Sequence, residues 1–244
     1  MAASTPEIIL YDLGSTEGIC FSPAVWRVRL LLNYKKIPYS TTFLEFPDIE
    51  PTLRPFGLVP DASTSGTKYT VPAIHHLPSN TYLMESDHIA EFLASNYPSP
   101  PLSLTSDLGK EIKTKARAAT AKAISCSIMP REIQILSPRA QEYFRRTREA
   151  VLGHPLEDLL DPKREEKAWS GVSNGMRAIE ELLKTNEADG PFILGARPSY
   201  DDFFIAGALQ STRVVDGNTF QRLTNYPGFK RIYEACSPYL ERKD

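Results

Sequence analysis

The proline-rich segment Tyr97-Pro98-Ser99-Pro100-Pro101 divides the chain into two halves with different patterns. Before it, β-rich runs alternate with apolar runs of helical period, as in an α/β unit. After it, the pattern is almost entirely helical. Because proline-rich segments are extended and stiff, this one is interpreted as a linker. We therefore predict an α/β domain over residues 1–97, a linker over residues 98–104 and an all-α domain over residues 105–244.

The α/β half has the element order βαβαββα. The expected strands are Glu7–Tyr11, Tyr39–Glu45, Tyr69–Leu77 and Tyr82–Met84. The expected helices are Pro23–Tyr34, Ile49–Arg54 and Ser86–Asn96, and a polar loop is expected over Asp61–Lys68. Ser86 is expected to cap the last of these helices.

The second half contains long helical runs separated by prolines. Ser137-Pro138 and Asp161-Pro162 each combine a capping side chain with a proline that suits the first helical turn. The expected helical runs are Leu108–Met129 before Pro130, Lys163–Lys184, Ser199–Val215, and Phe220–Leu240 with breaks at Pro227 and Pro238. A cleft between the two halves is the natural place for a ligand.

The composition is that of an ordinary globular protein and excludes several classes of function. The 244 residues are 41% hydrophobic and 24% charged, with a net charge of −2, so neither nucleic acid nor an anionic membrane is indicated as a partner. No apolar run approaches the ~20 residues that span a bilayer. The three cysteines lack metal-ligand spacing, and the N-terminus lacks a secretory pattern, so a cytoplasmic protein without a metal is expected.

The first candidate site is Ser22-Pro23, which follows a predicted strand and opens a predicted helix. Proline suits this position because its missing N–H would be unpaired in the first turn anyway. The remaining N–H groups and the positive end of the helix dipole favour an anion, so a hydroxyl here can hold and polarise a thiolate. The alternative interpretation is a serine cap without a chemical role.

The second candidate site is Val71-Pro72, at the head of a predicted strand. Proline cannot donate a hydrogen bond to a sheet, so it belongs at an edge or at a strand start. A cis bond at this proline turns the N–H and C=O of Val71 outward, where they can pair with the backbone of a bound peptide. The alternative is a trans proline at the sheet edge.

The third candidate site is Glu85-Ser86, at the start of a predicted helix. The serine hydroxyl and the helix-end N–H groups suit a carboxylate, and the glutamate suits an ammonium. Together they match the head group of an α-amino acid. The alternative is a capped helix whose acid complements the helix dipole.

In order and spacing, these three segments resemble the cytosolic glutathione transferases. Two further stretches agree with that family, namely Glu85–Leu93 before Tyr97-Pro98, and Gly190–Gly195 before Pro198–Asp202. In the latter, Ser199 and Asp202 have the spacing of a capping box. Within the family, the chain is similar to the serine-type, fungal and bacterial etherase-like branch, as judged by Ser22-Pro23, Trp26-Arg27, Arg29 and the loop Asp61–Lys68.

The resemblance implies a thioredoxin-like N-terminal domain with a mixed four-stranded sheet and an all-α C-terminal domain. It implies glutathione as cosubstrate, a homodimer, and attack of the glutathione thiolate on a hydrophobic, aromatic electrophile or aryl ether, in detoxification or fungal secondary metabolism. A glutathione- or ligand-binding protein without turnover, or a scaffold on the same fold, are the alternatives.

The resemblance also implies roles for single residues. Ser22 is the catalytic hydroxyl, because serine rather than cysteine at this position favours conjugation or ether cleavage over disulfide exchange. Val71, before Pro72, pairs with the cysteinyl backbone of glutathione, and Glu85 and Ser86 hold its γ-glutamyl end. The glycyl carboxylate needs a cation, and the candidates are Arg54 and Lys68.

Several points stay open at the level of the sequence. Ser15, Thr16 and Cys20 lie in the loop before Ser22, and each could reach the thiol or be a bystander. The following side chains of the helical half suit either a substrate pocket or the core: Ile124, Ile128, Met129, Tyr143 and Phe144. The basic run Arg145, Arg146 and Arg148 is interpreted as a solvated helix face.

Overall fold

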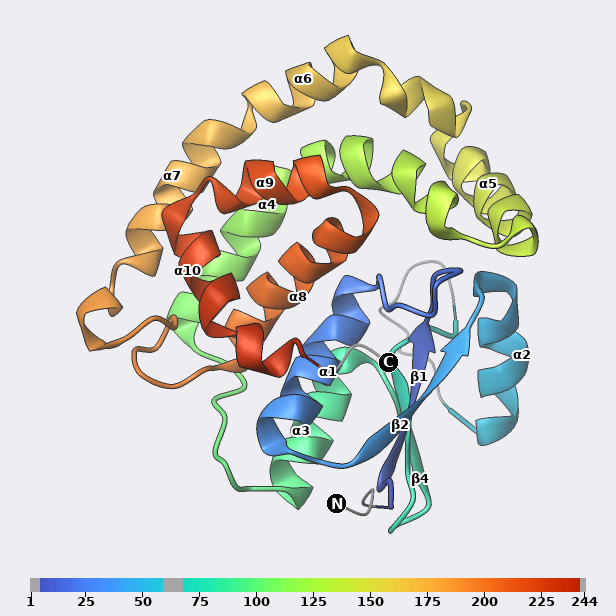
Figure 1. The fold of residues 1–244 in the computed structure, drawn as a ribbon, viewed down its shortest axis with the longest axis vertical. Coiled ribbons are helices and arrows are strands. Elements are labelled where there is room, and N and C mark those ends of the chain that lie inside the picture. The colour runs from blue at the N-terminus through green and yellow to red at the C-terminus, as the bar shows by residue number, and fades with distance from the viewer. Residues whose placement is uncertain (1–4, 59–67, 242–244) are drawn as a thin grey trace.

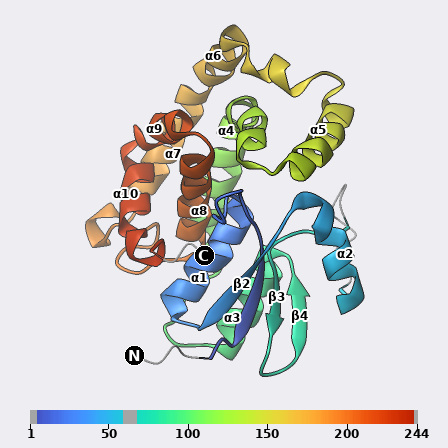
Figure 2. The same cartoon turned by 45° about the vertical axis from the view of Figure 1, so that its right-hand side comes forward.

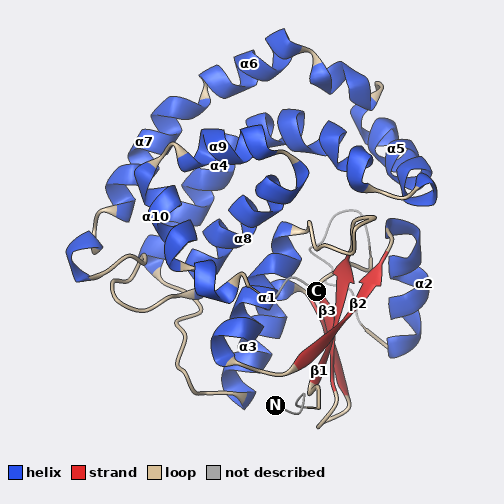
Figure 3. Cartoon of the chain, in the orientation of Figure 1, coloured by secondary structure: helices blue, strands red, loops and turns tan. Residues whose placement is uncertain are grey.

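The computed structural model describes residues 5–58 and 68–241, so the predicted loop Asp61–Lys68 lies outside the described residues except for Lys68. The N-terminal half contains one sheet of the strands β1 (Ile8–Leu13), β2 (Tyr39–Leu44), β3 (Ala73–His76) and β4 (Thr81–Met84). Their order is β2-β1-β3-β4, with β2 parallel to β1 and the other pairs antiparallel (Figure 3). The predicted mixed four-stranded sheet is therefore confirmed.

Helices cover both faces of this sheet. The helices α1 (Pro23–Lys35) and α3 (Ser86–Asn96) lie on one face, and the short α2 (Ile49–Leu53) lies on the other (Figures 1 and 2). Alternate residues of β1 point to opposite faces, because the side-chain period of a strand is two. Ile8 and Leu10 thus belong to the main core with α1, whereas Tyr11 packs in a second cluster with Leu53 of α2.

The C-terminal half is entirely helical. Its helices are α4 (Asp107–Glu132), α5 (Pro138–Leu152), α6 (Pro162–Ser170), α7 (Val172–Leu183), α8 (Tyr200–Val215), α9 (Gly217–Thr224) and α10 (Pro227–Ala235). Two predictions were wrong in detail. The first helix continues through Pro130, which lies in the last turn and so interrupts little of the hydrogen-bond ladder. The long run from Lys163 is divided at Gly171 into α6 and α7.

The two halves meet where α1 packs against α8 (Figure 1). The helices approach closely at Gly207, where a Cβ atom would lie 3.2 Å from the Cβ of Trp26. Ser199 and Asp202 form the predicted capping box at the start of α8. The hydroxyl of Tyr200 donates to the carbonyl of Ser86 at 2.7 Å, which ties α8 to α3 as well. The sheet domain is thus fixed against the helical domain through α8.

Residues 97–106, between α3 and α4, contain neither a helix nor a strand. In the part of the chain that the structure describes, no helix combines the length and apolarity needed to cross a membrane.

Candidate active site

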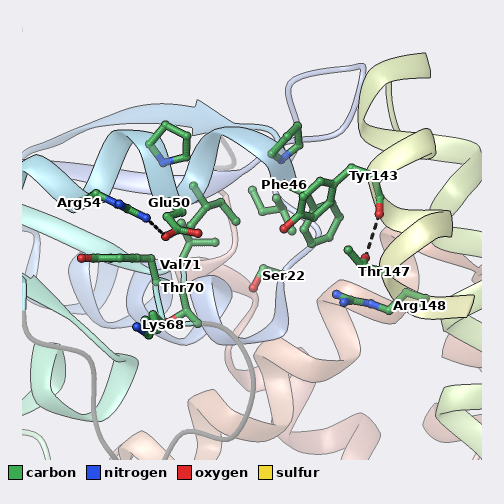
Figure 4. A pocket seen from close by; sticks show the side chains of 15 residues that line it. Ser22, Phe46, Glu50, Arg54, Lys68, Thr70, Val71, Tyr143, Thr147 and Arg148 are labelled. Atoms are coloured by element: carbon green, nitrogen blue, oxygen red, sulfur yellow. Dashed lines mark hydrogen bonds and ion pairs between the residues drawn. The ribbon is translucent and has the colours of Figure 1, made fainter. Parts of the chain in front are cut away.

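A cavity of about 680 Å³ lies between the two halves of the molecule (Figure 4). One wall comes from the sheet domain and the other from α5. The sheet-domain wall consists of Leu13, Ser22, Phe46, Pro47, Ile49, Glu50, Pro51, Arg54, Lys68, Tyr69, Thr70 and Val71. The α5 wall consists of Tyr143, Thr147 and Arg148. Four of the predicted site residues therefore share this cavity, namely Ser22, Arg54, Lys68 and Val71.

Ser22 is the N-cap of α1, as the sequence predicted. Its backbone is extended (φ −78°, ψ 122°), and Pro23 begins the helix. The Ser22 Oγ accepts a hydrogen bond from the N–H of Val25 at 3.3 Å. Its own proton is donated to no described residue and is available to a ligand in the cavity. Capping and a chemical role are therefore compatible at this position, because the cap uses a lone pair of the oxygen and a ligand would accept the O–H proton.

Three consecutive carbonyls fix the loop that carries Ser22. The carbonyl of Cys20 accepts from the Trp26 indole N–H at 2.9 Å. The carbonyl of Phe21 accepts from the Ser211 hydroxyl of α8 at 2.6 Å, and that of Ser22 accepts from the Trp26 amide at 3.0 Å. Both halves of the molecule thus hold the hydroxyl at the cavity.

The other polar side chains of this loop lie elsewhere. Cys20 is fully buried, and its burial raises the pKa of the thiol well above its ordinary value. Ser15 and Thr16 line a separate cavity of about 210 Å³, and the Ser15 Oγ accepts from the amides of Glu17 and Ile19. Of the hydroxyls and thiols in this loop, Ser22 is the one that lines the larger cavity.

Val71 lies two residues before β3, which is an inner strand of the sheet. Its peptide bond to Pro72 is cis, which was one of the two alternatives from the sequence. β3 begins only at Ala73, so Val71 is outside the ladder. No described residue pairs with the N–H or C=O of Val71. An extended peptide in the cavity can therefore use both groups.

Glu85 and Ser86 do not line the cavity, but Glu85 contacts a residue that does. The Glu85 carboxylate accepts from the hydroxyl of Thr70, a cavity residue, at 2.9 Å. Glu85 has φ 73° and ψ 123°, a conformation that costs non-glycine residues about 1–3 kcal/mol and is concentrated at ligand sites. The expectation that Ser86 caps α3 was wrong, since Ser86 is the first helical residue and Glu85 occupies the cap position.

The two candidate cations differ in their partners. Arg54 forms an ion pair with Glu50, four residues earlier, and both side chains are more than half exposed. Lys68 lines the same cavity and has no ion-pair partner within the described residues. Of the two, Lys68 is therefore the cation without an ion-pair partner in the described part of the chain.

The α5 wall contains Tyr143, which the sequence left open between pocket and core, and also Thr147 and Arg148, which the sequence did not indicate as pocket residues. Tyr143 lines the cavity, whereas Ile128 and Phe144 are core residues, 6% and 1% exposed. Arg148 also lines the cavity, so the interpretation of its basic run as a solvated face was wrong for this member. Its guanidinium carbon lies 4.9 Å from the ring centre of Phe144 and 5.6 Å from that of Phe46. The described residues contain no group of three or more His, Cys, Asp or Glu that could hold a metal ion.

Comparisons with known proteins agree with this architecture. Residues 21–96 match the N-terminal domain of glutathione S-transferase, and residues 112–239 match its C-terminal domain. The chain is 31% identical to the glutathione S-transferase-like protein ustS of Aspergillus flavus, over 95% of this chain and 90% of that protein. It is 28% identical to a maleylpyruvate isomerase of Ralstonia, over 86% of this chain and 85% of that protein.

Solved structures show the same relationship. A glutathione S-transferase of Ceriporiopsis subvermispora, in complex with glutathione, superposes with a TM-score of 0.85 at 28% identity, covering 97% of this chain and 99% of that one. A glutathione transferase of Phanerochaete chrysosporium gives a TM-score of 0.86 at 28% identity, covering 99% and 100%. With matches in both domains and a relative aligned along nearly its whole length, the chain belongs to the glutathione S-transferase family.

Proposed function

We propose that this protein is a serine-type glutathione transferase, in which Ser22 stabilises the glutathione thiolate for attack on an electrophile in the α5 half of the cavity. One observation carries the proposal. The Ser22 hydroxyl, at the N-terminus of α1, and the unpaired backbone of Val71 line the same cavity. A tripeptide thiol whose backbone pairs with Val71 thereby lies within reach of a hydroxyl donor and a helix dipole.

The energetic task of Ser22 is modest. A glutathione thiol has the pKa of an ordinary cysteine, about 8.5, so only about 3% is thiolate at pH 7. A hydroxyl that donates to sulfur, together with the helix N-terminus, favours the anion. A decrease of about two units in the thiol pKa makes thiolate the main form and corresponds to about 2.7 kcal/mol. Ser22 itself stays protonated, because the nucleophile belongs to the cosubstrate.

The remaining predicted residues are assigned to the ends of glutathione. Glu85 accepts from the γ-glutamyl ammonium, and Ser86 with the first amides of α3 holds the adjacent carboxylate. The strained backbone of Glu85 and its bond to the cavity residue Thr70 support this assignment. Pro72 fixes the backbone conformation next to Val71. Lys68 is assigned to the glycyl carboxylate, since Glu50 already neutralises Arg54.

The reaction is a substitution at an electrophilic carbon. The thiol proton passes to solvent, the sulfur forms the new C–S bond, and the leaving group departs with the electron pair of the broken bond. With an aryl ether, the leaving group is an alkoxide or phenoxide that then takes a proton. Chloronitroarenes are the simplest probes, because the absorbance changes when the thioether conjugate forms.

A Ser22→Ala variant tests the proposal. We expect kcat/KM for conjugation to decrease about 100-fold, which matches the thiolate stabilisation above. The calorimetric affinity for glutathione stays close to that of the wild type, because the backbone and head-group contacts are unchanged. Ser15→Ala is the matched control, since its hydroxyl lies on the separate cavity, and it keeps full activity.

Equal activity of Ser22→Ala and the wild type would refute the role of Ser22. If the protein binds glutathione but conjugates none of a broad panel of electrophiles, a binding protein on the same fold is favoured instead. The homodimer and the cytoplasmic location stay predictions. Sedimentation at micromolar concentrations tests the first of these, and fractionation of cells tests the second.

A further inference from the structure

Arg148 presents a positive charge to the half of the cavity that is left for the second substrate. It extends from α5, and its guanidinium points toward the side on which Ser22 lies (Figure 4). The glutathione contacts proposed above all come from the sheet domain. Arg148 is therefore outside that set of contacts and needs a different explanation.

The aromatic rings around Arg148 hold its guanidinium in position. Its central carbon lies over Phe144 at 4.9 Å and over Phe46 at 5.6 Å. These two rings contact each other with centres 5.3 Å apart. Rings on one side of a guanidinium fix it and leave its edge N–H groups available to an acceptor. Arg148 donates to no described residue and forms no ion pair with one.

No acid near Arg148 cancels its charge fully. Glu50, the acidic residue among those that line the cavity, is paired with Arg54. Glu132 of α4 interacts electrostatically with Arg148 but forms no ion pair with it. Burial raises the pKa of the Glu132 carboxyl to about 7, which favours the neutral form of this group. A partly exposed guanidinium that lines a cavity without a full ionic partner is a site for an anionic ligand group.

We propose that the second substrate carries a carboxylate-like oxyanion on an apolar, aromatic body, and that Arg148 binds this oxyanion. This inference rests on the proposed transferase activity and narrows its substrate class. Phe46, Pro47 and Tyr143 supply the apolar surface for the body of the substrate. The planar guanidinium suits a bidentate contact with a carboxylate. Arg148 takes no part in forming or breaking bonds and determines specificity only.

A pair of electrophiles that differ only in charge tests this assignment. The pair is a chlorodinitrobenzoate and its methyl ester, with each rate divided by the rate of the uncatalysed reaction with glutathione. In both, the thiolate displaces chloride, which leaves with the electron pair. We expect the wild type to favour the acid over the ester about tenfold or more, as a hydrogen-bonded charge pair typically does.

In Arg148→Gln, kcat/KM for the acid decreases about 10- to 100-fold, while that for the ester changes less than about twofold. Arg148→Lys keeps the charge but not the planar fork, so it retains part of the preference. Arg177→Gln is the charge-matched control, because Arg177 is exposed on α7, far along the chain from α5. This control leaves both rates unchanged.

Two results would overturn the inference. If Arg148→Gln lowers both rates equally and raises the pKa of bound glutathione, Arg148 acts on the thiolate. If the wild type does not distinguish the acid from the ester, the second substrate needs no anion. In either case the ester is still conjugated, so the proposed function survives. If the wild type conjugates neither the acid nor the ester, by contrast, the proposed function itself is contradicted.

Discussion

The two walls of the cavity are built in different ways. The sheet-domain wall offers a helix end and a strand edge, so its main groups are the Ser22 cap and the Val71 backbone. The α5 wall offers side chains alone, of which Tyr143 and Arg148 are the largest. Groups of the first wall are fixed by the backbone fold, whereas those of the second can change by single substitutions that leave the fold intact. We infer that the first wall determines the cosubstrate, and that the second wall, together with Phe46 and Pro47 of the first, determines the electrophile.

The first wall depends on a buried ion pair, and breaking this pair should have the largest effect on stability. Asp12 of β1 and Arg29 of α1 are both 0% exposed and lie 2.7 Å apart. They join the strand to the helix that carries Ser22. Asp12→Asn removes the carboxylate that offsets the buried Arg29 charge, while Arg29 still donates to the neutral hydroxyls of Tyr39 and Thr41. We therefore expect a loss of about 3–5 kcal/mol in the free energy of unfolding. Urea unfolding followed by circular dichroism measures this loss.

The double variant Asp12→Asn/Arg29→Met is the control for that loss. It removes both charges, so it should recover part of the stability that the single variant loses. If the double variant is less stable than Asp12→Asn, the cause is packing rather than a buried charge that no carboxylate offsets. The claim that the first wall is fixed by an ion pair beneath it would then be wrong.

The second wall should respond to pH through Glu132, the acid that interacts with Arg148. Burial raises its pKa from 4.5 in the unfolded chain to about 7 in the folded protein. Between these values the folded state binds more protons than the unfolded state, so the free energy of unfolding decreases as the pH rises. We expect this contribution to be about 3 kcal/mol between pH 4.5 and 8.

The difference in unfolding free energy between Glu132→Gln and the wild type isolates this contribution. Asp202 also has a raised pKa, of about 6, but it contributes equally to both proteins and cancels. The variant should therefore gain about 3 kcal/mol relative to the wild type as the pH rises through this window. A difference that does not change with pH would show that Glu132 ionises at its ordinary pKa.

The contrast between the walls also explains what could be predicted from the sequence. The start of α1 at Ser22-Pro23 and the capping box of Ser199 and Asp202 were predicted correctly, because caps are local and depend on a few adjacent residues. The mixed sheet followed from alternating runs and from the family resemblance. Ser86 was misplaced by one position, since both Glu85 and Ser86 are plausible residues at a helix start.

The α5 wall could not be predicted in the same way. Arg145 and Arg148 are three residues apart, so helical periodicity assigns them to similar faces. In the structure Arg145 pairs with Glu149 and Glu157, whereas Arg148 faces the cavity. Only the packing of α5 against Phe46 separates the two. By contrast, the spacing of Glu50 and Arg54 was a visible signal for an ion pair, and it could have favoured Lys68 as the unpaired cation.

A surface contact between the two walls should give the smallest effect. Arg139, at the start of α5, pairs with Asp48 at 2.6 Å and with Glu45 at 3.3 Å, both from the segment after β2. The Arg139 side chain is 59% exposed, so the contact is screened by solvent. Arg139→Gln should lower the free energy of unfolding by less than about 1 kcal/mol, measured by urea unfolding.

The same variant separates the roles of the walls. Arg139 orients α5 toward the segment that carries Phe46, so its loss should affect the KM for the electrophile and not the affinity for glutathione. We expect the former to rise by no more than about fivefold, in line with a contact worth under 1 kcal/mol. A comparable loss of glutathione affinity would mean that the α5 wall also positions the cosubstrate. The two walls would then form one binding site, and the division of labour between them would not hold.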